Sequence, residues 1–250
     1  CLPLRGVASI VPHEHLRWKE GATALPEYTI RMGQGEFTMV SLRAPAVAGR
    51  FYPADPVELS AVVQRYLHDG GRSACVSPNP KAIIAPHAGY RYSGEIAGSA
   101  FTLLQPSRAV IRRVVIIGPA HRLSVTGLAL PAESKFATPL GEVPVDAKAV
   151  DEIAGFDFVH IVGSAHAFEH ALEVHLPFLQ SALDSFSIVP LLAGDMSATH
   201  MRDLINHLWG GGETRFVISS DLSHFHDYDT ARRIDAETSS AIERLDADGI

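Results

Sequence analysis

The chain has 250 residues, 46% of them hydrophobic and 20% charged, which is enough apolar material for one large domain or two small ones. The formal net charge of −7, with no run of Lys or Arg, argues against nucleic acid as the main partner, and no apolar run approaches the roughly 18 residues that a membrane-spanning helix needs. With two cysteines in no CxxC spacing and no signal-peptide pattern at the N-terminus, the sequence predicts a cytoplasmic globular protein.

Residues 1–43 differ from the rest of the chain, because they contain short mixed stretches without a sustained period. Only Glu36–Leu42 alternates in the way that a strand does. We treat 1–43 as an N-terminal extension of unknown role and 44–250 as the globular domain. A helical pattern is still running at Ile250, so we expect this domain to be truncated at its C-terminus.

From residue 44 onward, predicted strands and helices alternate, which favours an α/β fold with a largely parallel central sheet covered by helices on both faces. Pro190 favours an edge position or a bulge for its strand. Pro177 lies inside a leucine-spaced helix, which therefore either begins near His175 or kinks there. The predicted strands are 81–85, 113–118, 124–130, 158–162, 187–192 and 215–219, and the predicted helices begin at Pro56 and span 95–104, 146–153, 172–183, 199–209 and 229–245.

Three of the predicted strands run directly into a histidine. In an open parallel sheet, functional residues lie just beyond the carboxyl ends of the strands. If the three strands are neighbours, their histidines and Asp221 gather at one rim, which is the composition of a metal or acid–base site. The histidines are His87 after strand 81–85, His121 after 113–118 and His224 after 215–219.

His87 lies in the segment APHAGY and His121 in GPAH, so proline and glycine turn the chain at each strand end. Neutral imidazoles suit Fe, Zn, Cu or Ni, and we expect His87 and His121 to be metal ligands. The alternative is a pair of ordinary loop histidines with satisfied hydrogen bonds.

Asp221 precedes His224 by three residues, and an aspartate beside a histidine can orient the ring and raise its basicity. The pair is suited to proton transfer, so both are candidate catalytic residues. The alternative is an aspartate that caps the next helix beside a surface histidine.

A second cluster lies in the segment EHALEVH at 169–175. An acid precedes each histidine, so the spacing is not that of an HExxH metalloprotease. The alternative is a charged helix face in water, for which histidine is an unusual choice. We expect part of this cluster to line a substrate pocket, together with a tyrosine of the first histidine loop; the candidates are Glu169, His170, His175 and Tyr90.

Six motifs in this order resemble the Memo family, also known as AmmeMemoRadiSam system protein B, over about 45–250. They are AVAGRFYPAD at 46–55, KAIIAPHAGYRYSG at 81–94, IIGPAH at 116–121, ATPLGEVPVD at 137–146, EHALEVHLPFLQ at 169–180 and FVISSDLSH at 216–224.

This family is similar to class III extradiol dioxygenases, which implies a three-layer α/β/α fold with a mixed, largely parallel sheet and a non-haem Fe(II) pocket. The resemblance implies that His87 and His121 are metal ligands and that His224, with Asp221 beside it, is the acid–base group. The family's third ligand is a cysteine in a C-terminal CG motif that this sequence does not contain, and neither Cys1 nor Cys75 lies in a matching context.

The sequence thus supports a Memo-like protein that binds Fe(II) or Cu and, if it is an enzyme, oxidises an unknown small molecule. A second hypothesis is a non-catalytic binding protein that uses the same pocket. For it the resemblance implies radical-SAM and AMMECR-type partner proteins. A third is a metal-dependent hydrolase, because two histidines and an aspartate also suit Zn²⁺-bound water.

Overall fold

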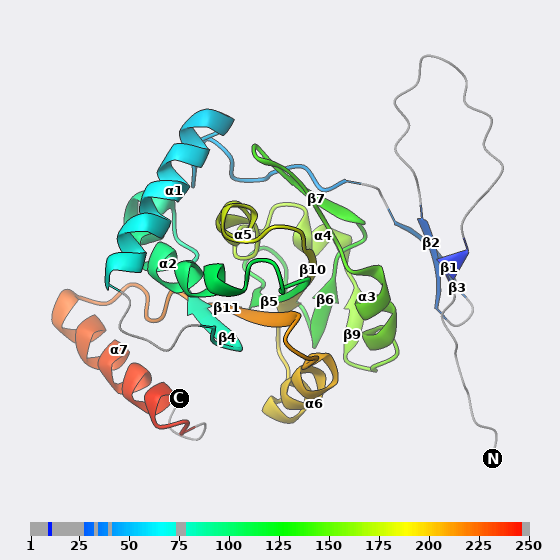
Figure 1. Ribbon diagram of the computed structural model, residues 1–250. Helices are drawn as coiled ribbons and strands as arrows, with labels where there is room; N and C mark the ends of the chain where they lie inside the picture. Colours follow the sequence, from blue (N-terminus) through cyan, green and yellow to red (C-terminus); the bar gives the residue numbers. More distant parts are fainter. Residues whose placement is uncertain (1–9, 12–27, 33–34, 40–41, 74–78, 247–250) are drawn as a thin grey trace.

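The computed structural model describes residues 10–11, 28–32, 35–39, 42–73 and 79–246 (Figure 1). A six-stranded sheet forms its centre, in the order β4-β11-β5-β10-β6-β9. The first four of these strands are parallel to one another, and β6 and β9 run the other way. The strands are β4 (Ala82–Ala85), β11 (Thr214–Ser219), β5 (Arg113–Pro119), β10 (Ser187–Ala193), β6 (Leu128–Leu130) and β9 (Val159–Ile161).

Helices cover both faces of the sheet, which confirms the expected three-layer α/β/α fold. On one face lie α1 (Pro56–Ser73), α2 (Tyr90–Phe101) and α5 (Leu176–Ala182), and on the other α3 (Ala147–Ile153) and α6 (Ala198–Leu208), while α7 (Tyr228–Glu243) lies beside β4 (Figure 1). Shorter elements are the 3-10 helices η1 (Thr102–Ser107) and η2 (Glu173–His175), α4 (Gly163–His166) and the hairpin β7 (Lys135–Thr138) and β8 (Gly141–Pro144).

The core lies on both faces of the sheet, and the α1–α2–α5 layer supplies its stacked aromatic rings. Val114, Val115 and Ile116 of β5 are completely buried, as expected for a parallel strand that is covered on both faces. Phe101 of α2 and Phe178 of α5 stack with ring centroids 5.2 Å apart. Each such side chain contributes about 1.5–3 kcal/mol through burial, so this layer is held firmly on the sheet.

The expected edge position of the strand at 187–192 is wrong, because β10 lies between β5 and β6. Backbone groups two residues apart in a strand point to the same side. The carbonyl of Ile188 accepts the Asp146 N–H on the side away from β5, so the nitrogen of Pro190 faces that side as well. There β6 pairs only with Leu192 and Ala193, and no ladder hydrogen bond is lost at the proline.

Of the two alternatives for Pro177, the structure shows the first: the helix begins near His175 and does not kink. Helix α5 begins at Leu176, so Pro177 occupies its first turn, where a missing N–H costs nothing. The helix expected at 146–153 is α3, and Asp146 caps it by accepting a hydrogen bond from Ala149 N.

Near the N-terminus, β1 (Ile10–Val11), β2 (Tyr28–Met32) and β3 (Gly35–Met39) form an antiparallel sheet of their own. Strand β3 confirms the first part of the strand expected at Glu36–Leu42, up to Met39. The rest of 1–41 and both cysteines, Cys1 and Cys75, lie outside the described residues.

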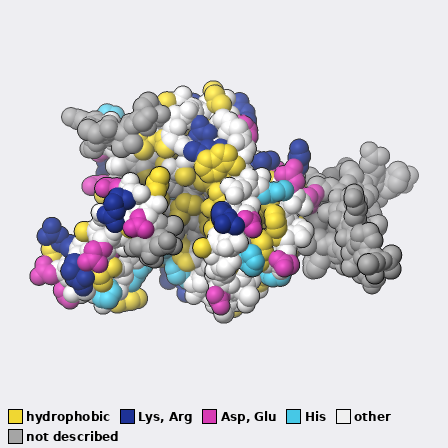
Figure 2. Space-filling model, turned by 90° about the horizontal axis from the view of Figure 1, so that it is seen from below, with side chains coloured by type: hydrophobic (Ala, Val, Ile, Leu, Met, Phe, Trp, Pro, Cys, Tyr) yellow, Lys and Arg dark blue, Asp and Glu magenta, His cyan; other side chains and the backbone are white. Residues whose placement is uncertain are grey.

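Acidic and basic side chains are interspersed over the face shown in Figure 2, with hydrophobic side chains between them. Within the described part of the chain, none of the helices combines the length and the apolar character that a membrane crossing requires.

Candidate metal centre

The three strands that end in histidine loops are neighbours in the sheet, as expected. Strand β11 lies between β4 and β5, with Ser219 opposite Ala85 and Ile218 opposite Ile117. The loops after β4 and β5 therefore leave the sheet at the same rim. They bring the rings of His87 and His121 to a centroid distance of 5.2 Å.

A third histidine completes this cluster, and it comes from the second motif. The His170 ring lies 4.7 Å from that of His121 and 5.6 Å from that of His87. One ligand nitrogen from each of the three histidines lies within 4.8 Å of the others. It is the one group of three or more potential metal ligands found among the described residues.

The turn that carries His170 reaches the sheet because β5 has a glycine near its end. A Cβ at Gly118 would lie 2.9 Å from Cδ2 of Leu172, 3.3 Å from Cβ of Ala171 and 3.1 Å from Cβ of Ser219. These distances are shorter than ordinary carbon contacts, so a larger residue would push the turn away from the strand. Gly118 thus lets two distant motifs meet.

The carboxylate of Glu169 organises this turn from a buried position. It accepts hydrogen bonds from the backbone N–H groups of His121 (2.6 Å), His170 (2.8 Å) and Ala171 (3.0 Å). Nδ1 of His121 lies 3.0 Å from Oε1, and Nδ1 of His170 lies 3.1 Å from the same oxygen. Burial raises the pKa of Glu169, but the hydrogen bonds from His170, Ala171 and His121 outweigh it and hold that pKa far below its usual value.

Since Glu169 is ionised, the His121 nitrogen beside it carries the proton. In the neutral ring, Nδ1–H of His121 donates to the carboxylate and Nε2 keeps its lone pair for a metal ion. A carboxylate behind a histidine is the usual support for a metal-ligating imidazole.

Ser219, the last residue of β11, supports His87 in the same way. Its hydroxyl donates to the carbonyl of Ala171 (2.7 Å), so its oxygen can accept from Nδ1 of His87 (2.7 Å) and Nε2 of His175 (2.9 Å). Burial lowers the pKa of His87 to about 4, which keeps the ring neutral. With the proton on Nδ1, Nε2 of His87 is bare.

The donor chemistry of the cluster therefore fits a divalent first-row metal ion. Two imidazoles present bare Nε2 atoms, and the third, His170, stacks against His121 with an interplanar angle of 22°. Neutral imidazole binds Fe, Cu, Zn and Ni, so the site selects a class of ion and not one element.

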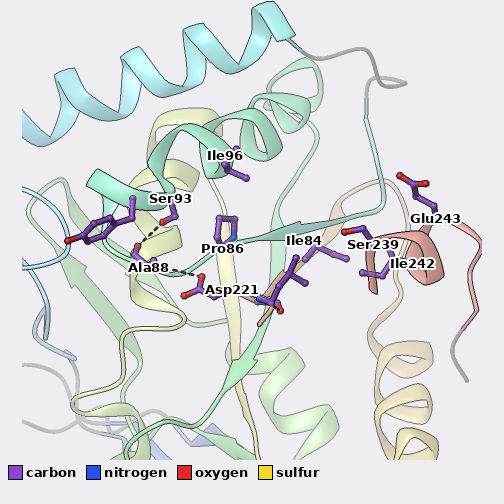
Figure 3. Close-up of a pocket in the computed structure, with 12 residues that line it drawn as sticks. Ile84, Pro86, Ala88, Ser93, Ile96, Asp221, Ser239, Ile242 and Glu243 are labelled. Carbon is purple, nitrogen blue, oxygen red and sulfur yellow. Dashed lines mark hydrogen bonds between the residues drawn. The ribbon is translucent and has the colours of Figure 1, made fainter. Parts of the chain in front are cut away.

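Asp221 lies between this cluster and His224. Its Oδ1 accepts a hydrogen bond from the backbone N–H of Ala88 (Figure 3) and another from the backbone N–H of His87. Its Oδ2 lies 3.7 Å from Nε2 of His87 and also 3.7 Å from Nε2 of His224. The alternative interpretation of Asp221 as a helix cap is wrong, because α7 is capped by Asp227.

The His224 ring lies outside the three-histidine cluster, and half of its side chain is exposed. Its loop is strained, since Leu222 and Phe225 on either side both adopt a φ of 62°. Its predicted role as an acid–base group, together with Asp221, stays a prediction.

Two predicted pocket residues lie in the interior. The hydroxyl of Tyr90 donates to the carbonyl of Val174 (2.7 Å), and His175 is completely buried behind Ser219. Their role in substrate binding stays a prediction as well.

The acidic motif 169–175 is not a charged helix face in water. Glu173 is completely buried and pairs with Arg43 at 2.6 Å, and it also accepts a hydrogen bond from the hydroxyl of Tyr52 (2.6 Å). Arg43 in turn donates to the carbonyls of His166 (2.7 Å) and Glu169 (2.5 Å). This ion pair, which the sequence analysis missed, ties residue 43 to the turn that carries His170.

Comparison with known proteins agrees with this architecture. The family model described as "Memo-like protein" matches residues 43–250. A MEMO1 family protein of Methanobrevibacter smithii is 34% identical over 219 residues, which are 82% of this chain and 77% of that protein. A relative from Archaeoglobus fulgidus is 34% identical (82% and 76% covered), and one from Ignicoccus hospitalis is 36% identical (84% and 78% covered).

Proposed function

The chain belongs to the family of Memo-like proteins, and on that premise we propose that His87, His121 and His170 hold a redox-active metal ion, Fe(II) or copper, for the oxidation of a small molecule. The observation that carries this proposal is the three-histidine cluster with its proton-bearing Nδ1 atoms turned toward Ser219 and Glu169. When bound, such an ion supplies Lewis-acid and one-electron redox chemistry.

The residues of the chain prepare this site in two ways. Burial keeps His87 neutral, and the ionised carboxylate of Glu169 places a negative charge behind His121, which offsets part of a cation's charge. Exposure of the three ligand side chains rises from 3% at His87 through 14% at His170 to 36% at His121. A small molecule therefore reaches the site from the His121 side.

Asp221 and His224 form the candidate path for protons. Asp221 Oδ2 stands between the His87 ring and the half-exposed His224 ring, so His224 can exchange protons with solvent and pass them inward. We expect His224→Ala to keep its metal and to lose turnover. Unchanged turnover in this variant would remove His224 from the mechanism.

A metal-dependent hydrolase is the second candidate, because the three-histidine ligand set also suits a zinc ion. Three histidines with an open fourth position are also a catalytic zinc arrangement, in which bound water becomes the nucleophile. In this case Asp221 and His224 would move the protons of that water.

Anaerobic loading of the chain with Fe(II), copper or Zn²⁺ separates these candidates. Oxygen uptake on a panel of catechols that needs iron or copper, and that disappears in the His87→Ala, His121→Ala double variant, supports oxidation. Zinc-dependent ester hydrolysis without oxygen supports the hydrolase. Metal binding with neither activity contradicts both and favours a binding module, for which radical-SAM and AMMECR-type proteins are the proposed partners.

A further inference from the structure

We propose that a cavity of about 580 Å³ beside the metal centre binds an oxyanion, so that the small molecule handled there carries a carboxylate or phosphate-like group. The inference rests on the proposed function only in assigning this ligand to the metal site. The walls of the cavity include Arg50, Arg122, Leu123, Ser164 and Phe168.

Three wall residues of the cavity are sequence neighbours of residues in or beside the three-histidine cluster. Arg122 is the residue after His121, and Phe168 is the residue before Glu169. Arg50 precedes Phe51, whose ring lies 4.7 Å from that of His170. His121 is also the most exposed of the three ligands, and the proposal places the oxyanion site on this open side of the cluster.

The two arginines are available to a ligand. Both are exposed, and within the described part of the chain neither forms an ion pair or a side-chain hydrogen bond. Other arginines do pair with carboxylates, among them Arg108 with Asp184 and Arg113 with Asp146, at 2.7 Å in each case. None of the residues that line the cavity is acidic, so it is a positive site in a chain of net charge −7.

The chemistry of the walls defines the ligand. Guanidinium groups bind carboxylate and phosphate oxygens with paired hydrogen bonds. Phe168 and Leu123 are 72% and 43% exposed and give the cavity an apolar wall. A ligand that uses both has an aromatic or apolar body with an oxyanion at one end.

The test uses probes that share one catechol ring and differ in the charge of its substituent. Calorimetry measures their affinity for the zinc-loaded chain and for the metal-free chain. The probes are 3,4-dihydroxybenzoate, its uncharged amide 3,4-dihydroxybenzamide, and 3,4-dihydroxyphenylphosphonate. We expect the chain to prefer the anions over the amide by about tenfold or more, as charged hydrogen bonds provide, and the stronger anion identifies the group.

In the Arg50→Gln, Arg122→Gln double variant this preference should fall close to unity while zinc content stays unchanged. The matched control Arg65→Gln, on α1 and outside the cavity, should keep it. Equal affinity for anion and amide in the original chain, or an undiminished preference in the double variant, would overturn the inference. Failure to hold zinc contradicts only the proposed function, because the charge preference is also measured without metal.

Discussion

The carboxylate of Glu169 contacts both the backbone and the ring of His121. It accepts a hydrogen bond from the His121 backbone N–H at 2.6 Å and lies 3.0 Å from Nδ1 of the ring. One side chain thus fixes the position of the His121 backbone and the tautomer of its ring. In the neutral ring of His121, this contact leaves Nε2 as the nitrogen that can bind a metal ion.

Glu169→Gln should weaken metal binding by about 10- to 100-fold, as losses of such supporting carboxylates do. The amide keeps the size of the side chain and removes its charge. Competition with a chromophoric chelator measures the affinity. Glu152→Gln, on α3 away from the cluster, is the control, and equal affinity in the two variants would contradict the role of Glu169.

In Ser219→Ala, the Nδ1–H tautomer of His87 should no longer be favoured, because the substitution removes the oxygen that accepts from Nδ1 at 2.7 Å. Nitrogen-15 NMR of the metal-free chain reads the tautomer directly. We expect Nδ1–H in the original chain and a mixture in the variant, with Ser99→Ala on α2 as the control. An Nε2–H form of His87 in the original chain would contradict this arrangement.

Glu173→Gln should lower the free energy of unfolding by about 3–5 kcal/mol, because it leaves the buried Arg43 charge without its partner. Urea denaturation measures the change. The matched control is Glu142→Gln, whose ion pair with Lys135 is about half exposed and should contribute no more than about 1 kcal/mol. Similar decreases in the free energy of unfolding in both variants would show that the buried ion pair stabilises the fold no more than the exposed one.

The stability of the chain should fall as the pH drops from 6.5 toward 4. Burial lowers the pKa of His166 from 6.5 to about 4, so in this window the unfolded chain binds a proton that the folded chain excludes. One such proton changes the free energy of unfolding by roughly 1.4 kcal/mol per pH unit. Above pH 6.5, His166 does not contribute to the pH dependence of the free energy of unfolding.

Urea denaturation across the window checks this effect, with His166→Gln expected to reduce the slope. Glutamine can still donate to the carbonyl of Ala129, which His166 contacts at 2.9 Å. The exposed His68 serves as the control through His68→Gln. A slope that persists unchanged in His166→Gln would assign the pH dependence to other groups.

The sequence predicts much of this structure because hydrophobic periodicity and strand-end motifs are local signals. The alternating elements and the meeting of His87 with His121 follow from the rule that parallel strands end at one rim. The burial of Glu173 could not be foreseen, since its partner Arg43 lies 130 residues away. Pro190 was misleading because its position in the sheet depends on where the short strand β6 pairs.

The membership of His170 in the cluster was hidden for a similar reason. The predicted helix begins at residue 172 and leaves the path of 169–171 open, whereas the structure holds 169–172 in a turn that packs against Gly118. An acid directly before the histidine was the available signal, and it indicated a pocket residue without showing that the ring reaches His121.

Metal affinity of the His170→Ala variant tests the central claim most directly. After Fe(II) or Zn²⁺ loading, elemental analysis and chelator competition should show stoichiometric metal in the original chain and in the control His200→Ala, which lies on α6 away from the cluster. His170→Ala, like His87→Ala and His121→Ala, should bind the ion at least about tenfold more weakly. Equal metal content and affinity in His170→Ala and the original chain would contradict the three-histidine site.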